Sequence, residues 1–175
     1  MIYNAEDILN AREQRAEFQD KLIKKYNNTL VMIRVNYPGV NKNNYVTQGI
    51  INIINKEVLN TFTNEVLYKV LRETAEGPIA TIVVDRSPED VKRNTMIIED
   101  NHSLGRFIDI DVYNSKGKSL SRTKFGYSMR KCYLCDAPAQ ECVRAMKHKQ
   151  NDIIEYIDKK YKAYKFWESE YDKNI

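Results

Sequence analysis

The stretch EVLYKVLRETAEGPIATIVVD, Glu65 to Asp85, decides the fold that we expect for this chain. Its two halves, EVLYKVLRET and GPIATIVVD, flank the turn-like AEG, and this arrangement predicts an antiparallel hairpin. Upstream, TLVMIRVN (29–36) is rich in β-forming residues and runs into the loop residues of NYPGVNKNN, which predicts another strand. Downstream, we expect a strand at residues 106–113, a turn at NSKGK, and a partner strand at SLSR (119–122).

Helical periodicity accounts for most of the remaining chain. Asn4 is expected to cap the first helix, and Ser87 followed by Pro88 is typical of a helix start. The expected helices cover residues 5–26, 44–60, 88–100, 139–149 and 151–167. The prediction is therefore a single α/β (α+β) domain over residues 1–175, with a mixed sheet of about five strands flanked by helices.

The composition is that of an ordinary globular protein, with 175 residues, 42% hydrophobic and 30% charged, and a formal net charge of +4. This mildly basic balance permits an anionic ligand without requiring one. No window approaches about 18 uninterrupted apolar residues, so we expect no membrane span. The N-terminus lacks the basic and apolar regions of a secretory signal. The chain has three cysteines, an odd number that cannot all pair in disulfides. We therefore expect reduced thiols in a cytoplasmic protein.

Two aspartates interrupt the apolar strand in HSLGRFIDIDVY. Side chains alternate along a strand, so Asp109 and Asp111 share one face and the neighbouring apolar residues share the other. Such carboxylates repel each other unless a divalent cation joins them, and their oxygens suit Mg²⁺. The pattern predicts a phosphoryl-transfer metal site, with a solvated face paired to Lys or Arg as the alternative. Nearby, Gly105 permits close backbone approach, Arg106 offers a phosphate clamp, and His102 lies just upstream.

A second group of chemically active residues lies in RKCYLCDAPAQECVRAMKHK. Its metal-binding side chains are Cys132, Cys135, Cys142 and His148. The Cys-x₂-Cys spacing suits tetrahedral Zn²⁺, and Cys142 with His148 could complete a Cys₃His shell for a structural ion in a subregion over residues 130–150. A helix over 139–149 would put Cys142 and His148 on roughly opposite sides unless it began late or ended early. A redox Cys-x-x-Cys pair and three small buried hydrophobic residues are the alternatives.

Several stretches together resemble one known family. EDNHSLGRFIDIDVYNSKGKSLSR followed by GYSMRKCYLCDAPAQECVRAMKHK closely resembles the citrate lyase holo-acyl-carrier-protein synthases, or apo-citrate lyase phosphoribosyl-dephospho-CoA transferases. ILNAREQRAEFQ and VNYPGVNKN match as well, so the resemblance covers most of the chain. The family has Pro where this chain has Ser103, and residues 151–175 look like a C-terminal helical extension.

The resemblance implies a nucleotidyltransferase-like fold and reaction. The donor would be 2′-(5″-triphosphoribosyl)-3′-dephospho-CoA, and the acceptor a serine of the acyl-carrier subunit of apo-citrate lyase. The products would be the phosphodiester-linked prosthetic group and diphosphate. A similar enzyme serves malonate decarboxylase, so the resemblance defines the chemistry more closely than the acceptor.

In this interpretation Asp109 and Asp111 hold Mg²⁺, and one of them or a third carboxylate accepts the serine proton. The candidates for the third carboxylate are Asp85, Glu99 and Asp100. Basic and amide side chains should converge on a polyphosphate donor. Together with Arg106, Gly105 and His102, those that we expect to bind it are Arg122, Lys42, Asn36, Asn43, Arg12 and Arg15.

Two other functions stay open from the sequence. Basic residues surround the cysteines, so a small zinc-knuckle module that binds nucleic acid is the main alternative. The strand aspartates argue against it, because carboxylates repel a phosphate backbone unless a metal intervenes. The amphipathic, aromatic C-terminal helix could instead dock another protein or a second copy of the chain.

Overall fold

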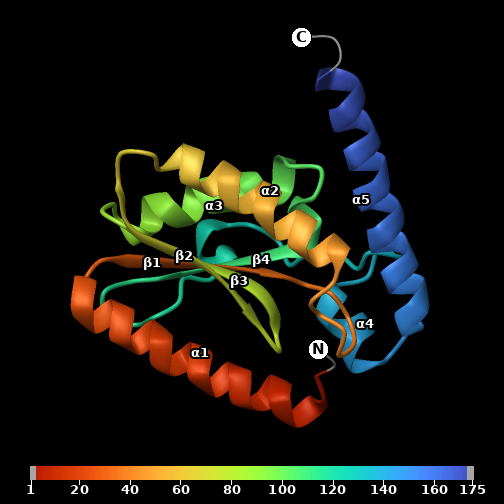
Figure 1. The fold of residues 1–175 in the computed structure, drawn as a ribbon, viewed down its shortest axis with the longest axis horizontal. Helices are drawn as coiled ribbons and strands as arrows, with labels where there is room; N and C mark the ends of the chain where they lie inside the picture. Colours follow the sequence, from red (N-terminus) through yellow and green to blue (C-terminus); the bar gives the residue numbers. More distant parts are fainter. Residues whose placement is uncertain (1–2, 173–175) are drawn as a thin grey trace.

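The computed structural model describes residues 3–172 and contains a four-stranded antiparallel sheet with helices on both faces (Figure 1). The strands are β1 (Thr29–Val35), β2 (Val66–Thr74), β3 (Gly77–Val84) and β4 (Ile108–Tyr113), in the order β2-β3-β1-β4. The predicted hairpin is β2–β3, with Thr74 opposite Gly77 at its turn. The α/β class is confirmed. The sheet is wholly antiparallel rather than mixed, and within the described residues it has one strand fewer than expected.

Five α-helices surround the sheet. They are α1 (Ala5–Tyr26), α2 (Tyr45–Thr61), α3 (Pro88–Asn101), α4 (Ala139–Arg144) and α5 (Gln150–Asp172). In Figure 1, α1 lies along one face of the sheet, α2 and α3 lie along the other, and α5 stands at one end. The predicted caps form: the Asn4 side chain accepts the Asp7 backbone N–H in a capping box, and Ser87 caps α3 ahead of Pro88. These caps satisfy N–H groups that a helix start would otherwise leave unpaired.

Each face of the sheet carries its own apolar core because side chains alternate along the strands. Ile33 and Ile110 belong to the core on the side of α2, where Ile50 is completely buried. Met32 belongs to the opposite core, which includes Leu22 of α1. The central strands β1 and β3 are thus buried on both faces, whereas side chains of β2 and β4 remain partly exposed. A polar side chain on a central strand must therefore find a partner or reach an uncovered end.

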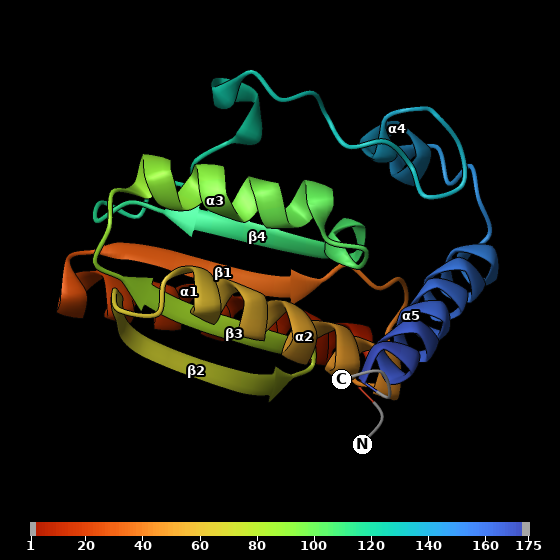
Figure 2. The same ribbon diagram turned by 90° about the horizontal axis from the view of Figure 1, so that it is seen from above.

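The predicted partner strand at 119–122 does not form. Ser119 makes only an isolated bridge with Tyr113, and the Leu120 N–H donates to the carbonyl of Val112. The segment between β4 and α4 instead passes outside the β4 edge before reaching α4 (Figure 2).

Side chains occupy the backbone groups that such a partner strand would need. Glu99 accepts the Ile110 N–H at 2.8 Å, and the Lys92 ammonium donates to the Ile110 carbonyl at 2.9 Å. Arg130 donates to the Ile108 carbonyl. The edge of β4 is therefore satisfied without a fifth strand, which explains why the expected ladder is absent there.

The predicted helix at 139–149 is too long, because α4 ends at Arg144. Met146 follows with φ of 45°, in the left-handed region, so the chain reverses direction. His148 then lies in the short connection before α5 begins at Gln150. This reversal removes the geometric objection to grouping His148 with the cysteines.

Helix α5 is packed into the domain rather than merely appended to it. Ile157 is completely buried and Tyr161 is 3% exposed. Gly49 of α2 makes room for the Tyr161 ring, because a Cβ at Gly49 would lie 1.8 Å from the Tyr161 hydroxyl oxygen. The last three residues of the predicted extension 151–175, and the first two of the predicted domain 1–175, lie outside the described residues. No described helix is long and apolar enough to cross a membrane.

Candidate active site

The two strand aspartates lie on the α1 face of β4, since the intervening Ile110 belongs to the opposite core. Arg34 of β1 is the register partner of Asp109, and its Nη2 donates to Oδ2 of Asp111 at 2.7 Å. The side chains of Asp109 and Asp111 are 43% and 35% exposed, so both remain accessible. Burial lowers the pKa of Arg34, but the charge and hydrogen bond of Asp111, with the charge of Asp109, outweigh it and raise that pKa overall. Arg34 is thus a fixed cation beside the acidic pair.

Arg130 forms a second cationic contact with this pair. It forms an ion pair with Glu99, and its Nη1 lies 3.3 Å from Oδ1 of Asp109. The Glu99 side chain is only 4% exposed. Burial acts to lower the pKa of Arg130, but the charges of Glu99 and Asp109 raise it overall. Arg130 therefore links α3, β4 and the segment that carries the cysteines.

Four basic side chains gather near the acidic pair around one buried glutamate. Arg12 and Arg15 of α1 lie 3.4 Å and 2.7 Å from the Glu76 carboxylate, which is 6% exposed and lies in the β2–β3 turn. Burial lowers the pKa of Lys42, the charges of Arg12 and Arg34 lower it further, and Glu76 opposes them. The charge of Arg34 lowers the pKa of Lys42, and the charges of Asp109 and Glu76 raise the pKa of Arg34. These electrostatic interactions connect the group to the acidic pair. We call Arg12, Arg15, Arg34 and Lys42 the basic cluster.

Other predicted donor-binding residues have structural partners. Arg122 pairs with Asp100 at the end of α3 at 2.7 Å, and Asn43 donates to the carbonyl of Thr74. The Nδ1 atom of His102 accepts a backbone N–H, and its ring lies 5.5 Å from that of Tyr164. Burial lowers the pKa of His102. None of these contacts involves the acidic pair.

Gly105 allows a close approach, but the approach is to α3. A Cβ at Gly105 would lie 2.5 Å from the carbonyl oxygens of Ile98 and Glu99, so the position accepts no side chain without a backbone shift. The three candidates for a third carboxylate are also accounted for. Glu99 binds Arg130 and Asp100 binds Arg122, whereas Asp85 follows β3 at the opposite end of the sheet from Asp109.

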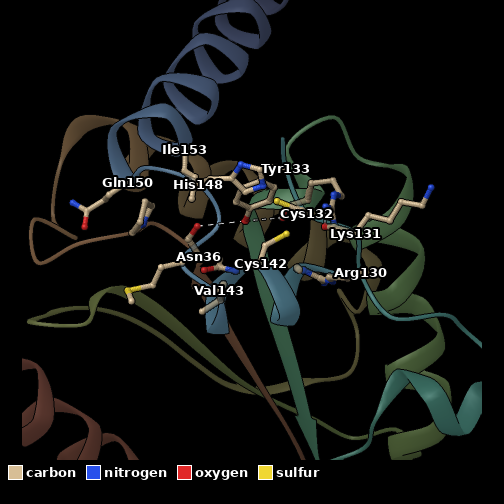
Figure 3. A pocket seen from close by; sticks show the side chains of 14 residues that line it. Asn36, Arg130, Lys131, Cys132, Tyr133, Cys142, Val143, His148, Gln150 and Ile153 are labelled. Atoms are coloured by element: carbon tan, nitrogen blue, oxygen red, sulfur yellow. Dashed lines mark hydrogen bonds between the residues drawn. The ribbon is translucent and has the colours of Figure 1, made fainter. Parts of the chain in front are cut away.

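Arg106 and Asn36 line a cavity of about 410 Å³ at the end of the sheet where β4 begins (Figure 3). The remaining walls come from the cysteine segment, α4 and the start of α5. Tyr133 donates hydrogen bonds toward the carbonyls of Asn36 and Arg106, and the Arg106 guanidinium lies 5.4 Å from the Tyr133 ring. Burial, followed by the charge of Asp109, raises the pKa of Tyr133, so this phenol stays protonated. Arg130 also lines the cavity, which places the cavity next to Asp109.

The cysteines and histidine form a compact group. The ligand atoms of Cys132, Cys135, Cys142 and His148 all lie within 4.8 Å of one another, so the group could hold a metal ion. Sγ of Cys135 is 3.5 Å from Sγ of Cys142 and 3.3 Å from Nε2 of His148. A backbone hydrogen bond from Ala137, then hydrogen bonds from His148 and Cys142, lower the pKa of Cys135 to about 6. Burial raises the pKa of Cys142 to about 11.

The fold and site define an α/β protein with an acidic pair, a basic cluster and a Cys/His group that could hold a metal ion. The chain belongs to the family described as apo-citrate lyase phosphoribosyl-dephospho-CoA transferase, whose profile matches residues 3–164. It is 30% identical over 151 residues to the transferase of that name from Citrobacter koseri, covering 85% of this chain and 82% of that protein. The corresponding Escherichia coli O7:K1 protein is 29% identical over 156 residues, 87% of this chain and 85% of its own length.

A longer relative matches in part. Protein CitXG of Haemophilus influenzae is 32% identical over 155 residues, which is 87% of this chain but 33% of that protein. This chain therefore spans about one third of that relative. The matches do not favour the nucleic-acid-binding alternative, since the relatives named here as transferases match over most of their length.

Sequence reasoning missed three residues of the site: Arg34, Glu76 and Arg130. Arg34 carried a usable signal, because it is the charged residue in the otherwise apolar strand TLVMIRV. Arg130 is one of several basic residues around the cysteines, and its contact with Glu99 joins residues far apart in the chain. Glu76 lies in a turn, where a single acidic residue is typical of a solvent-exposed position.

Proposed function

We propose that this chain transfers a phosphoribosyl-dephospho-CoA group from a triphosphate donor to a serine of the acyl-carrier subunit of apo-citrate lyase. The observation that carries the proposal is the acidic pair Asp109–Asp111 beside the basic cluster, in a chain that belongs to this transferase family. Phosphoryl transfer needs positioning and charge stabilisation more than covalent help from the protein. Carboxylates and fixed cations on one sheet face are suited to that task.

The acidic pair fits Mg²⁺ as a site of two carboxylates. Among the described residues, Asp109 and Asp111 are not part of a group of three or more acidic, His or Cys ligands. Mg²⁺ commonly binds through one or two carboxylates and takes its other ligands from water and substrate phosphates. Bound there, it would stabilise negative charge on the phosphates during transfer. Arg34 and Arg130 hold the two carboxylate groups on the strand.

The reaction forms a bond between the serine Oγ and the α-phosphorus of the donor. The bond from that phosphorus to the next bridging oxygen breaks, and diphosphate leaves with the electron pair. Asp109 or Asp111 accepts the serine proton, as a carboxylate can when it lies within hydrogen-bonding reach. Arg34, beside Asp111, and Lys42, whose Nζ donates to the Tyr37 carbonyl, bind phosphate oxygens of the donor, because cations favour anionic oxygen partners.

For the Cys/His group we propose a structural zinc ion. A tetrahedral site with Zn–S bonds near 2.3 Å separates its sulfurs by roughly 3.8 Å, close to the 3.5 Å between Cys135 and Cys142. Three thiols and one imidazole fill four positions and leave none for substrate. Because Arg130 precedes Cys132 by two residues, zinc would hold the segment that brings Arg130 to Asp109.

The transfer reaction has a direct test. The purified chain is incubated with apo acyl-carrier subunit, triphosphoribosyl-dephospho-CoA and Mg²⁺, and mass spectrometry follows the added prosthetic group. We expect Asp109→Asn and Asp111→Asn to lose at least about 100-fold in rate, since general acid–base groups contribute at this level. Asp85→Asn, at the other end of the sheet, is the matched control and should retain full rate. No transfer by the unaltered chain would exclude the function, and full turnover by either pair variant would exclude the acidic pair.

The zinc site is tested by elemental analysis of protein purified without added metal. One zinc per chain is expected, and Cys142→Ser should lower both the zinc content and the transfer rate. Protein that contains no zinc but holds a disulfide between Cys132 and Cys135 would support the redox Cys-x-x-Cys alternative instead.

A further inference from the structure

The cavity beside the acidic pair has two chemically different ends. Figure 3 shows Gln150 on one side of it and Arg130 and Lys131 on the other, with Asn36 between them. Its apolar walls include Val143 and Ile153. A site of this kind suits a ligand whose body is flat and apolar and whose tail is anionic.

Two side-chain amides of the cavity are available to a ligand. Asn36 and Gln150 are both exposed, and within residues 3–172 the structure gives no hydrogen bond to the side-chain amide of either. An amide presents a donor and an acceptor side by side, which matches the edge of an adenine base. The Gln150 amide also packs against Gly39, since a Cβ there would lie 2.6 Å from its Nε2, and this contact leaves the hydrogen-bonding capacity of the amide for a ligand.

We infer that this cavity binds the adenosine part of the donor, an inference that rests on the proposed transferase function. The base lies between the apolar walls and its edge meets Asn36 and Gln150. The phosphates attached to the adenosine extend toward Arg106, Arg130 and Lys131. A volume of about 410 Å³ is near the small end of ligand pockets, which span about 300–1,000 Å³, and suits a nucleoside rather than the whole donor.

The cationic end of the cavity is the end that borders the acidic pair. Arg130 lines the cavity and also lies 3.3 Å from Asp109, so one guanidinium spans both places. A nucleoside held at the Gln150 end therefore directs its phosphorylated substituents toward Asp109. The cavity thus anchors the unreactive part of the donor while the acidic pair acts on its triphosphate, a division that raises the effective concentration of the reacting groups.

The test uses dephospho-CoA, which lacks the triphosphoribosyl group and cannot react. Calorimetry with the full, metal-loaded chain should show binding, and ADP should compete for it whereas 4′-phosphopantetheine should not. Val143→Trp fills the cavity from an exposed position and should weaken binding at least about tenfold, a change that corresponds to about 1.4 kcal/mol. Asn36→Ala and Gln150→Ala should each weaken it several-fold. Asn151→Ala, the exposed neighbour of Gln150 on α5, is the matched control and should bind as the unaltered chain does.

The outcomes separate this inference from the proposed function. If the chain transfers the prosthetic group but Val143→Trp, Asn36→Ala and Gln150→Ala leave dephospho-CoA affinity and donor KM unchanged, the cavity assignment is wrong and the function stands. Competition by 4′-phosphopantetheine instead of ADP also overturns the adenosine assignment. If dephospho-CoA binds and Val143→Trp blocks it while the unaltered chain performs no transfer, the cavity assignment stands and the proposed function fails. An unchanged melting temperature in each variant establishes that the fold is intact.

Discussion

Replacing Arg130 by methionine should destabilise the protein because it leaves Glu99 as a buried carboxylate without its cation. The Glu99 side chain is 4% exposed and that of Arg130 is 18% exposed. Glu99 keeps the Ile110 N–H as a hydrogen-bond donor, at 2.8 Å, and the charge of the buried Lys92 still acts on it, so it loses its ion-pair partner but not all of its favourable contacts. The same substitution removes the hydrogen bond from Arg130 to the Ile108 carbonyl on the β4 edge.

The size of the effect follows from the burial of the pair. Breaking a buried ion pair by removing one partner typically costs about 3–5 kcal/mol. Because Arg130 retains some exposure, we expect the lower end, about 3 kcal/mol. In a chain of this size each kcal/mol moves the melting temperature by about 2–4 °C, so we expect a drop of about 6–12 °C.

Urea unfolding followed by circular dichroism measures the free energy of unfolding. A double-mutant cycle isolates the pair, because Glu99→Gln removes the charge and keeps an oxygen for the Ile110 N–H. The combined variant should lose less than the sum of the single changes, by at least about 1 kcal/mol. Arg144→Met, at an exposed arginine of α4, is the control and should change stability by no more than about 0.5 kcal/mol. A loss under about 1 kcal/mol for Arg130→Met, or strict additivity in the cycle, would refute the assignment of a buried pair.

Three further changes test the packing and the pH response of the fold. Gly105→Ala should cost about 2–3 kcal/mol in urea unfolding, because the new methyl group meets two carbonyl oxygens of α3 at 2.5 Å. Gly49→Ala should displace Tyr161 and loosen α5, which limited proteolysis would detect as faster cleavage within that helix. Burial lowers the pKa of His102, so the unfolded chain takes up this proton first and stability falls as the pH drops below about 6.5. His102→Asn keeps an acceptor for the Leu104 N–H without titrating, so its melting temperature should fall less between about pH 7.5 and 5.5 than that of the unaltered chain.

Each of these expectations has a result that would contradict it. Gly126→Ala is the control for Gly105→Ala, because a Cβ at Gly126 meets no atom within 4 Å. The φ of 79° at Gly126 disfavours alanine, so this variant should lose only about 1 kcal/mol of unfolding free energy. An equal loss of stability in the two variants would mean that a shift of the surrounding backbone relieves the clash at Gly105. Unchanged cleavage of α5 in Gly49→Ala, or the same pH dependence with and without His102, would show that these contacts do not control stability.

Elements with a clear local signal were predictable from the sequence. The hairpin, β1 and helices α1 to α3 lie within one or two residues of their predicted bounds, since caps and alternation act over a few neighbouring residues. The partner strand at 119–122 was wrong because side chains from α3 and the cysteine segment occupy the β4 edge. The end of α4 was wrong because the reversal occurs at Met146, a residue with no turn preference of its own.

In the candidate site, too, the features with a local sequence signal were predictable and those that depend on tertiary contacts were not. Alternation alone predicts that Asp109 and Asp111 share a face, and the Cys-x₂-Cys spacing predicts that its two thiols lie close together. The partners of the aspartates depend on which strands pair and in what register, and no local pattern contains that information. Arg34 faces the acidic pair only because β1 and β4 are neighbours, although they lie far apart in the sequence.

The two edges of the sheet differ in a way that bears on self-association. The outward backbone of β4 is closed by Lys92, Glu99 and Arg130, whereas β2 forms the other border with no strand beyond it in the described part of the chain. Lys69 lies between the exposed Leu67 and Leu71 on the same face of β2, and its charge opposes the pairing of this edge with an identical strand. A further strand, whether in an oligomer or in an aggregate, would therefore add at β2. Neutralising Lys69 would remove the charge that opposes this association.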